Sequence, residues 1–271
     1  MKKVLVSVLI FAIVGLVHGQ WTQLSTQDAI NAALKNDMTW IGKSAVYGKT
    51  PIYQIGINTA VAATDEDVTI QSGVQPYLNY GQTLKIVSSN QADDTSGTGA
   101  TCIVLTGLDS SYTYYAASKV YLGGKDTVSS SVKFVRIWDA KVTVAGTGGI
   151  NDGAISITNS TGDTVLALID STSGYARSPM ALLTVPDNKT FYMTSITAQT
   201  HTNKATVISL YVRPSGAEWY LADIFEIQTG GPVSKEFSIP LVFDEKTDIA
   251  LRANASGGAG HVTASFAGWW E

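Results

Sequence analysis

The feature that most constrains this fold is a two-residue alternation of apolar and polar side chains, which recurs in short segments after about residue 49. The alternation is clearest in 132–144, 205–214, 247–255 and 261–266. Successive side chains of a β-strand point to opposite faces of a sheet. The pattern therefore predicts strands with one buried face and one solvent-facing face, as is typical of antiparallel sheets.

Glycine-rich turn signals separate these segments at short intervals; they lie at 97–99, 123–124, 146–153, 230–232 and 256–260. No stretch of 10–15 residues between the predicted strands has helical periodicity, which argues against a βαβ fold. Many short strands joined by such turns are typical of sandwiches and jelly rolls. We therefore predict an all-β fold of two antiparallel β-sandwich or jelly-roll-like units, preceded by a short N-terminal helix.

A small, polar stretch at 170–178 is the best internal boundary, so we predict a first β-sandwich unit over 48–172 and a second over 173–271. The second unit should contain seven strands, near 180–185, 190–200, 205–214, 218–228, 233–243, 247–255 and 261–270. Pro240 lies inside one of them. Because proline donates no backbone hydrogen bond, that strand is expected at a sheet edge or at a bulge.

The first 47 residues differ from the rest. Residues 1–19 begin with two lysines, continue as the apolar run Val4–Val17 and end at Gly19, which predicts a secretory signal cleaved before Gln20. The run is shorter than the roughly 20 residues of a membrane-spanning helix. An uncleaved anchor, or a helix buried in an assembly, is the alternative. Residues 20–47 predict a short amphipathic helix, which Ser25 could cap.

Composition excludes several functional classes. Only 15% of the 271 residues are charged, 45% are hydrophobic and the net charge is −4, so a packed fold is expected. No basic stretch could neutralise a phosphate backbone, which argues against nucleic-acid binding. No second hydrophobic run follows the signal, so we expect no membrane contact once the signal is removed. The single cysteine, Cys102, allows no internal disulfide and is expected in the core.

The sequence offers little chemistry for catalysis. After signal removal only His201 and His261 remain, one in a predicted loop and one on the polar face of the last strand. Neither has a second histidine or cysteine at ligand spacing, and no Gly-x-Ser-x-Gly elbow is present. We therefore expect no catalytic residue, no metal site, no cofactor and no enzymatic activity.

Acidic and aromatic clusters have simpler interpretations. The acids at 65–67 and 93–94 are expected in solvated turns, with a calcium site as the alternative, and 151–153 is expected to be a turn. Tyr112, Tyr114 and Tyr115, like Trp269 and Trp270, suit core or interface packing, or stacking on sugars. Three glycosylation sequons begin at Asn159, Asn188 and Asn254.

An ordered series of motifs resembles the virion structural proteins of marine tailed bacteriophages over roughly residues 80–267. Its segments are Gly99–Asp109 followed by Tyr112, Phe134–Ile137, Ala145–Gly153, Leu183–Thr190, Val212–Pro214, Phe237–Leu241 and Glu245–Ile249. The resemblance implies a β-rich particle component without catalytic residues.

The leading hypothesis is a structural subunit of a virus particle or a related extracellular assembly. Its expected partners are further copies of itself and other structural proteins, and its expected location is the virion or the extracellular space. The alternative is a secreted carbohydrate-binding or adhesin module that binds surface glycans. A secreted hydrolase would require His201 or His261 beside a nucleophile in a pocket.

Overall fold

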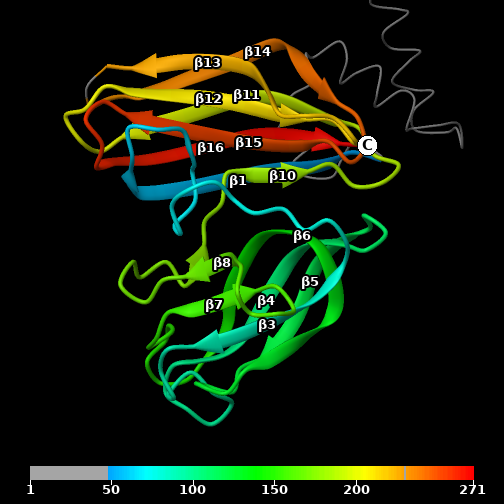
Figure 1. The fold of residues 1–271 in the computed structure, drawn as a ribbon, viewed down its shortest axis with the longest axis vertical. Helices are drawn as coiled ribbons and strands as arrows, with labels where there is room; N and C mark the ends of the chain where they lie inside the picture. Colours follow the sequence, from blue (N-terminus) through cyan, green and yellow to red (C-terminus); the bar gives the residue numbers. More distant parts are fainter. Residues whose placement is uncertain (1–47, 229) are drawn as a thin grey trace, which may run out of the picture. The chain divides into compact units, whose positions relative to one another are not determined.

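The computed structural model describes residues 48–228 and 230–271 (Figure 1). The predicted signal segment 1–19 and the predicted helix within 20–47 lie outside the described residues. The described part consists of strands β1 to β16 and contains no helix. The predicted all-β, sandwich-like class of antiparallel sheets is thereby confirmed. No helix in this part of the chain is long and apolar enough to span a membrane.

The chain divides into a small unit, residues 1–52 with 269–271, and a large unit, residues 53–268. In the small unit the Lys49 ammonium lies 4.9 Å from the centre of the Trp269 ring and 3.9 Å from the Glu271 carboxylate. These contacts join the start of the described chain to its last residues.

One sheet of the large unit has the strand order β5-β4-β6-β3-β7-β8, with β9 paired to β6. Its strands are β3 (Gln82–Ser88), β4 (Ala100–Asp109), β5 (Tyr114–Tyr121), β6 (Val128–Ala145), β7 (Ile155–Thr158), β8 (Val165–Ile169) and β9 (Arg177–Ser178). The paired strands are antiparallel. The hairpins β4–β5 and β7–β8 use connections short enough for adjacent antiparallel strands.

Two further sheets have the orders β1-β16-β11-β14 and β10-β15-β12-β13, with β2 paired to β15. Their strands are β1 (Thr50–Val61), β2 (Glu66–Asp67), β10 (Leu182–Thr184), β11 (Phe191–Thr200), β12 (Thr206–Arg213), β13 (Tyr220–Ile227), β14 (Pro232–Phe243), β15 (Asp248–Ala255) and β16 (Gly260–Trp270). All seven strands predicted after residue 178 are present, within two residues at each end. The predicted division into two units at residue 172 stays a prediction.

The apolar positions of the alternating segments form the core. Ile208, Leu210 and Val212 of β12 are buried, as are the alternating apolar residues of β15 and β16. The Phe191 ring stacks on Phe243 and meets Phe266 edge-on, with ring centres 6.2 and 6.1 Å apart. Cys102 is buried in β4, which confirms its expected core position.

The alternation fails in β6. Residues 134, 135 and 137–140 are buried without regard to parity, whereas Val144, predicted to face the core, is 53% exposed. Asp139, predicted to face solvent, is buried and forms an ion pair with Arg177 of β9 at 2.6 Å. The prediction was wrong for Asp139 because β9 pairs with β6 at Ala140 and Lys141 and brings the Arg177 cation beside the buried carboxylate.

Pro240 lies where the sequence predicted. Its strand, β14, is the edge strand of its sheet, and the pairing with β11 shifts register between Met193 and Ser195. Their partners are Leu241 and Glu236, so Pro240 falls inside the irregular stretch. A residue without an N–H costs no ladder hydrogen bond at that point.

Candidate functional site

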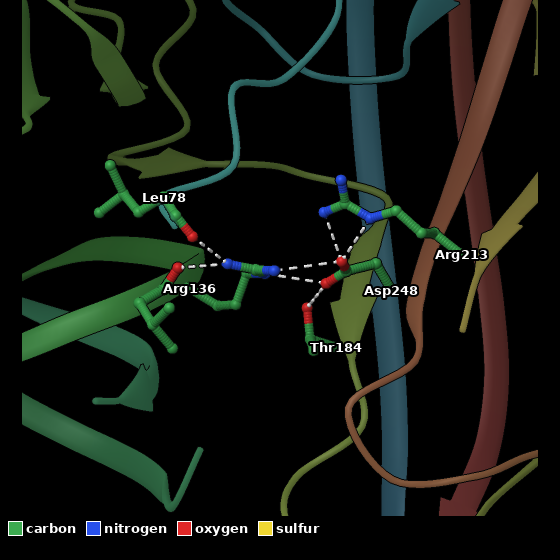
Figure 2. Close-up of polar contacts among 6 residues, drawn as sticks. Leu78, Arg136, Thr184, Arg213 and Asp248 are labelled. Atoms are coloured by element: carbon green, nitrogen blue, oxygen red, sulfur yellow. Dashed lines mark hydrogen bonds and ion pairs between the residues drawn. The ribbon is translucent and has the colours of Figure 1, made fainter. Parts of the chain in front are cut away.

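The most elaborate polar cluster in the described residues is built on Asp248, the first residue of β15 (Figure 2). Arg136 of β6 donates from Nε to Oδ1 at 2.8 Å and from Nη2 to Oδ2 at 3.2 Å. Arg213 of β12 donates to Oδ2 from Nε at 3.0 Å and Nη2 at 2.6 Å, and the Thr184 hydroxyl donates to Oδ1 at 2.6 Å. The Asp248 carboxylate thus connects β15 to β6, β10 and β12, and it accepts hydrogen bonds from two guanidinium groups.

Arg136 is held on every side. Its Nη1 donates to the carbonyl oxygens of Leu78 and Val135, at 2.7 and 2.8 Å (Figure 2). Burial alone would lower its pKa, but the hydrogen bonds and charge of Asp248 outweigh burial and raise the pKa of Arg136 above the ordinary arginine value. This guanidinium is a permanent cation, and each of its three nitrogens donates at least one hydrogen bond.

Tyr77 lies against both arginines. Its ring centre is 4.9 Å from the Arg136 guanidinium and 4.7 Å from that of Arg213, and it meets the Trp219 ring edge-on at 5.3 Å. The hydroxyl is buried and has no hydrogen-bond partner in the part of the chain that the structure describes. Burial, reinforced by the charges of Asp67 and Asp248, raises the pKa of Tyr77 well above its ordinary value, so the ring stays neutral.

A polar cavity of about 350 Å³ opens beside the cluster; its charged and aromatic lining comprises Tyr112, Arg136, Arg213, Lys246 and Asp248. Lys246 lies in the turn between β14 and β15 and pairs with Asp187 at 2.5 Å. The hydrogen bond to Asp187 raises the pKa of Lys246. The lining also includes the turn 214–217, which follows β12 directly.

Sequence reasoning did not single out this cluster as a site. The groups that bind Asp248 lie 35 to 112 residues from it along the chain, and no spacing rule brings them together. One signal was present: Arg136, Thr184, Arg213, Lys246 and Asp248 all lie in the motif segments that the sequence analysis named. Those segments therefore meet at one place in the fold.

The prediction that the acids at 93–94 lie in a solvated turn was wrong for Asp93. Its side chain is buried and accepts hydrogen bonds from the backbone N–H groups of Ala100, Asp152 and Gly153, each at 2.8 Å, and from the Ser88 hydroxyl at 2.5 Å. The expected turn at 151–153 is present and is fastened to the 93–100 loop through this carboxylate. Because four donors already surround it, Asp93 acts as an organiser of backbone.

The prediction that the acids at 65–67 lie in a solvated turn was also wrong for Asp67. It is fully buried in β2, where it pairs with Arg252 at 2.9 Å and accepts a hydrogen bond from the Gln75 N–H. Asp65 accepts hydrogen bonds from the Tyr211 hydroxyl and the Asn254 amide. No group of three or more histidine, cysteine, aspartate or glutamate side chains suited to a metal occurs among the described residues.

The two histidines come together, which the sequence did not predict. His201 follows β11 and His261 lies on β16, with ring centres 4.5 Å apart. The His201 Nε2 lies 3.0 Å from the Thr263 hydroxyl. Within the described residues no carboxylate is hydrogen-bonded to either ring, so neither histidine is oriented as a triad base would be.

The predicted tyrosine cluster is partly exposed. Tyr114 and Tyr115 of β5 are exposed, and Tyr121 of the same strand is more so. Tyr114 stacks on Trp138 with ring centres 6.0 Å apart, and Tyr115 meets Phe134 edge-on. The rings of Tyr114 and Tyr115 thus pack against β6 and remain partly exposed.

Two edge strands present apolar side chains to solvent. Tyr220, Leu221 and Ile224 of β13 are about half exposed, and Ile239 and Val242 of β14 are more exposed still. Both strands are terminal in their sheets, so one backbone edge of each has no strand partner in the described parts of the chain. Asp223 and Lys235 join the two strands by an ion pair at 2.6 Å.

No protein-family model and no curated protein matches this chain. Solved structures similar to it include one of the infectious bursal disease virus Gx strain, at 10% identity over 82% of this chain and 71% of that chain, with a TM-score of 0.21. A crystal structure of the infectious bursal disease virus VP2 subviral particle matches at 8% identity over 82% and 76%, with a TM-score of 0.16. At these TM-scores the likeness carries no argument about function.

Proposed function

We propose that this protein is a structural subunit of a virus particle or a related extracellular assembly, without enzymatic activity, and that it acts through β packing between copies of itself. The observation that carries the proposal is the exposed apolar edge strand β13. The ordered motif series, which resembles phage virion proteins, agrees with it. Other structural proteins of the same particle are the further expected partners.

Strand β13 has little of the usual protection of an edge beyond one register shift, which falls at Ala222 in its pairing with β12. Its sequence, residues 220–227, contains no lysine, proline or glycine, and its only charged residues are Asp223 and Glu226. Soluble proteins blunt such edges with lysine, proline or bulges, as Pro240 does on β14. An edge with exposed Tyr220, Leu221 and Ile224 and without lysine or proline is a template for adding another strand.

A second copy of the chain is the occupant that this edge fits. In a two-fold symmetric contact the same patch meets itself, so the surface must be compatible with its own copy. Side chains such as Leu221 and Ile224 satisfy that condition without any opposite charge. Pairing β13 of one copy with β13 of a second copy would bury the apolar patch of each and pair the backbone groups that are free at the two edges.

The test is the sedimentation of the purified chain over a range of concentrations. We expect the wild type to form multi-subunit species and Ile224→Lys to remain smaller, because a charge on the edge opposes strand addition. Val144→Lys is the matched control, since Val144 has the same 53% exposure as Ile224 but lies on β6. A wild type that stays monomeric at every concentration, or an Ile224→Lys variant that assembles normally, would contradict the proposal.

A secreted carbohydrate-binding or adhesin module is the second candidate, favoured by the exposed tyrosines of β5. Aromatic rings with one free face stack on sugar rings. Tyr121, 63% exposed, is the best placed. Glycan-array binding by the wild type that is lost in Tyr121→Ala would support this candidate, and a blank array would remove it.

A further inference from the structure

The wall of the cavity beside Asp248 carries more positive than negative charge. Three cationic groups line it, those of Arg136, Arg213 and Lys246, against the single carboxylate of Asp248. Asp187 and Glu245, whose charges act on Lys246, do not line the cavity. Because Arg136 and Arg213 share one carboxylate, their cluster retains a positive charge. A charge in a partly buried place is stabilised by a counter-charge.

Arg213 has hydrogen-bonding capacity left over. Its Nε and Nη2 both donate to Asp248, whereas Nη1 has no hydrogen-bond acceptor in the described part of the chain. Figure 2 shows the nitrogen without a dashed line at the far side of the guanidinium from Asp248. The Arg213 side chain is 26% exposed, compared with 10% for Arg136, so it is the arginine of the pair that a ligand can reach.

The orientation of Arg213 is fixed before any ligand arrives. Asp248 holds two of its three nitrogens, and the guanidinium plane lies over the rings of Tyr77 and Trp219, at 4.7 and 4.9 Å. A preorganised guanidinium loses little conformational entropy when it binds an oxygen ligand. Lys246, which also pairs with Asp187, adds a further cation at the same cavity, and the turn at 214–217 forms another part of its wall.

We propose that this cavity binds the oxoanion group, phosphate or carboxylate, of a small ligand, with Arg213 Nη1 as the principal donor and Lys246 as the second cation. Guanidinium groups match the oxygen spacing of both anions. A volume of about 350 Å³ lies in the range of small-molecule sites. The cavity lies apart from the β13 edge residues, so the proposal does not depend on the assembly function.

The experiment is calorimetric titration of the full chain with inorganic phosphate and, separately, with acetate, at constant ionic strength and pH 7.5. We expect saturable binding of at least one anion. Removal of one charge-assisted hydrogen bond should weaken binding about tenfold in Arg213→Gln. Lys246→Gln should weaken binding about threefold or more, since it removes a point charge from the rim. Lys119→Gln, an exposed lysine of β5 that does not line the cavity, is the control and should bind as the wild type does.

Stronger binding of phosphate would identify a phosphorylated ligand, and stronger binding of acetate a carboxylated one; both support the site. If Arg213→Gln does not fold, Lys246→Gln decides the question, because its side chain is at the surface. Absence of saturable binding to either anion, or equal affinity in Lys246→Gln, Arg213→Gln and Lys119→Gln, would overturn the proposal. None of these outcomes changes the sedimentation result expected for Ile224→Lys.

Discussion

At the scale of single residues, Asp93 shows how much one buried carboxylate can organise. It gathers three backbone N–H groups and a hydroxyl from the end of β3, the start of β4 and the loop before β7. Close packing around it also explains Gly99, since a Cβ at that position would collide with the Asp93 carboxylate. The motif segments 99–109 and 145–153 therefore contain residues, such as Gly99 and Gly153, that contact the Asp93 carboxylate or leave space for it.

We expect Asp93→Asn to destabilise the protein by about 2–4 kcal/mol. An amide in place of the carboxylate turns an acceptor into a donor and leaves buried N–H groups without a partner. Urea unfolding followed by circular dichroism measures the change. Asp94→Asn is the control, because Asp94 is only partly buried and accepts its hydrogen bonds at the surface, so this change should have a smaller effect. Equal stability of the two variants would show that the Asp93 hydrogen bonds contribute little.

The histidine pair makes stability depend on pH. Burial, and then the proximity of His201, lower the pKa of His261 below the ordinary value of about 6.5. Above pH 6.5 the ring is neutral in both folded and unfolded chains and contributes nothing. As the pH falls below 6.5 the unfolded chain takes up the proton first, so stability decreases. We expect His261→Gln to flatten this decrease between pH 7.5 and 5, measured by urea unfolding. A variant with the same pH slope as the wild type would refute this role.

At the scale of elements, Asp248 makes the start of β15 depend on β6 and β12. Asp248→Ala would leave Arg136 and Arg213 with no carboxylate, and the loss of one partner from a buried ion pair costs about 3–5 kcal/mol. We expect destabilisation of that order, measured by thermal or urea unfolding. A change below about 1 kcal/mol would mean that solvent replaces the carboxylate freely.

The local sequence pattern predicted the strands well. It failed where burial and pairing depend on elements that are distant in the sequence. The period-two segments located β12, β15 and β16, and Pro240 located an edge, because both signals depend only on neighbouring residues. The burial of Asp139 in β6 depends on Arg177 of β9, and the burial of Asp67 depends on Arg252. No local pattern predicts either partner. For the same reason the joining of Arg136 to Asp248, 112 residues later, was not foreseen.

At the scale of the whole molecule, the assembly hypothesis predicts that thermal stability depends on protein concentration. If copies associate only when folded, mass action raises the unfolding temperature as the concentration rises. Differential scanning calorimetry over a hundredfold range of concentration measures this effect. The Ile224→Lys variant should show a constant unfolding temperature, and a wild type with a constant value would argue against association of folded copies.

The pairing of β2 with β15 has a consequence for synthesis. Arg252 and Asp67 are separated by 185 positions, and Asp67 leaves the ribosome long before its partner exists. At roughly 5–20 residues per second the delay is about 10–40 seconds. Throughout that interval a carboxylate destined for complete burial must remain hydrated, and the surrounding strands cannot close over it. Completion of this part of the fold therefore waits until Arg252 has been synthesised and has left the ribosome.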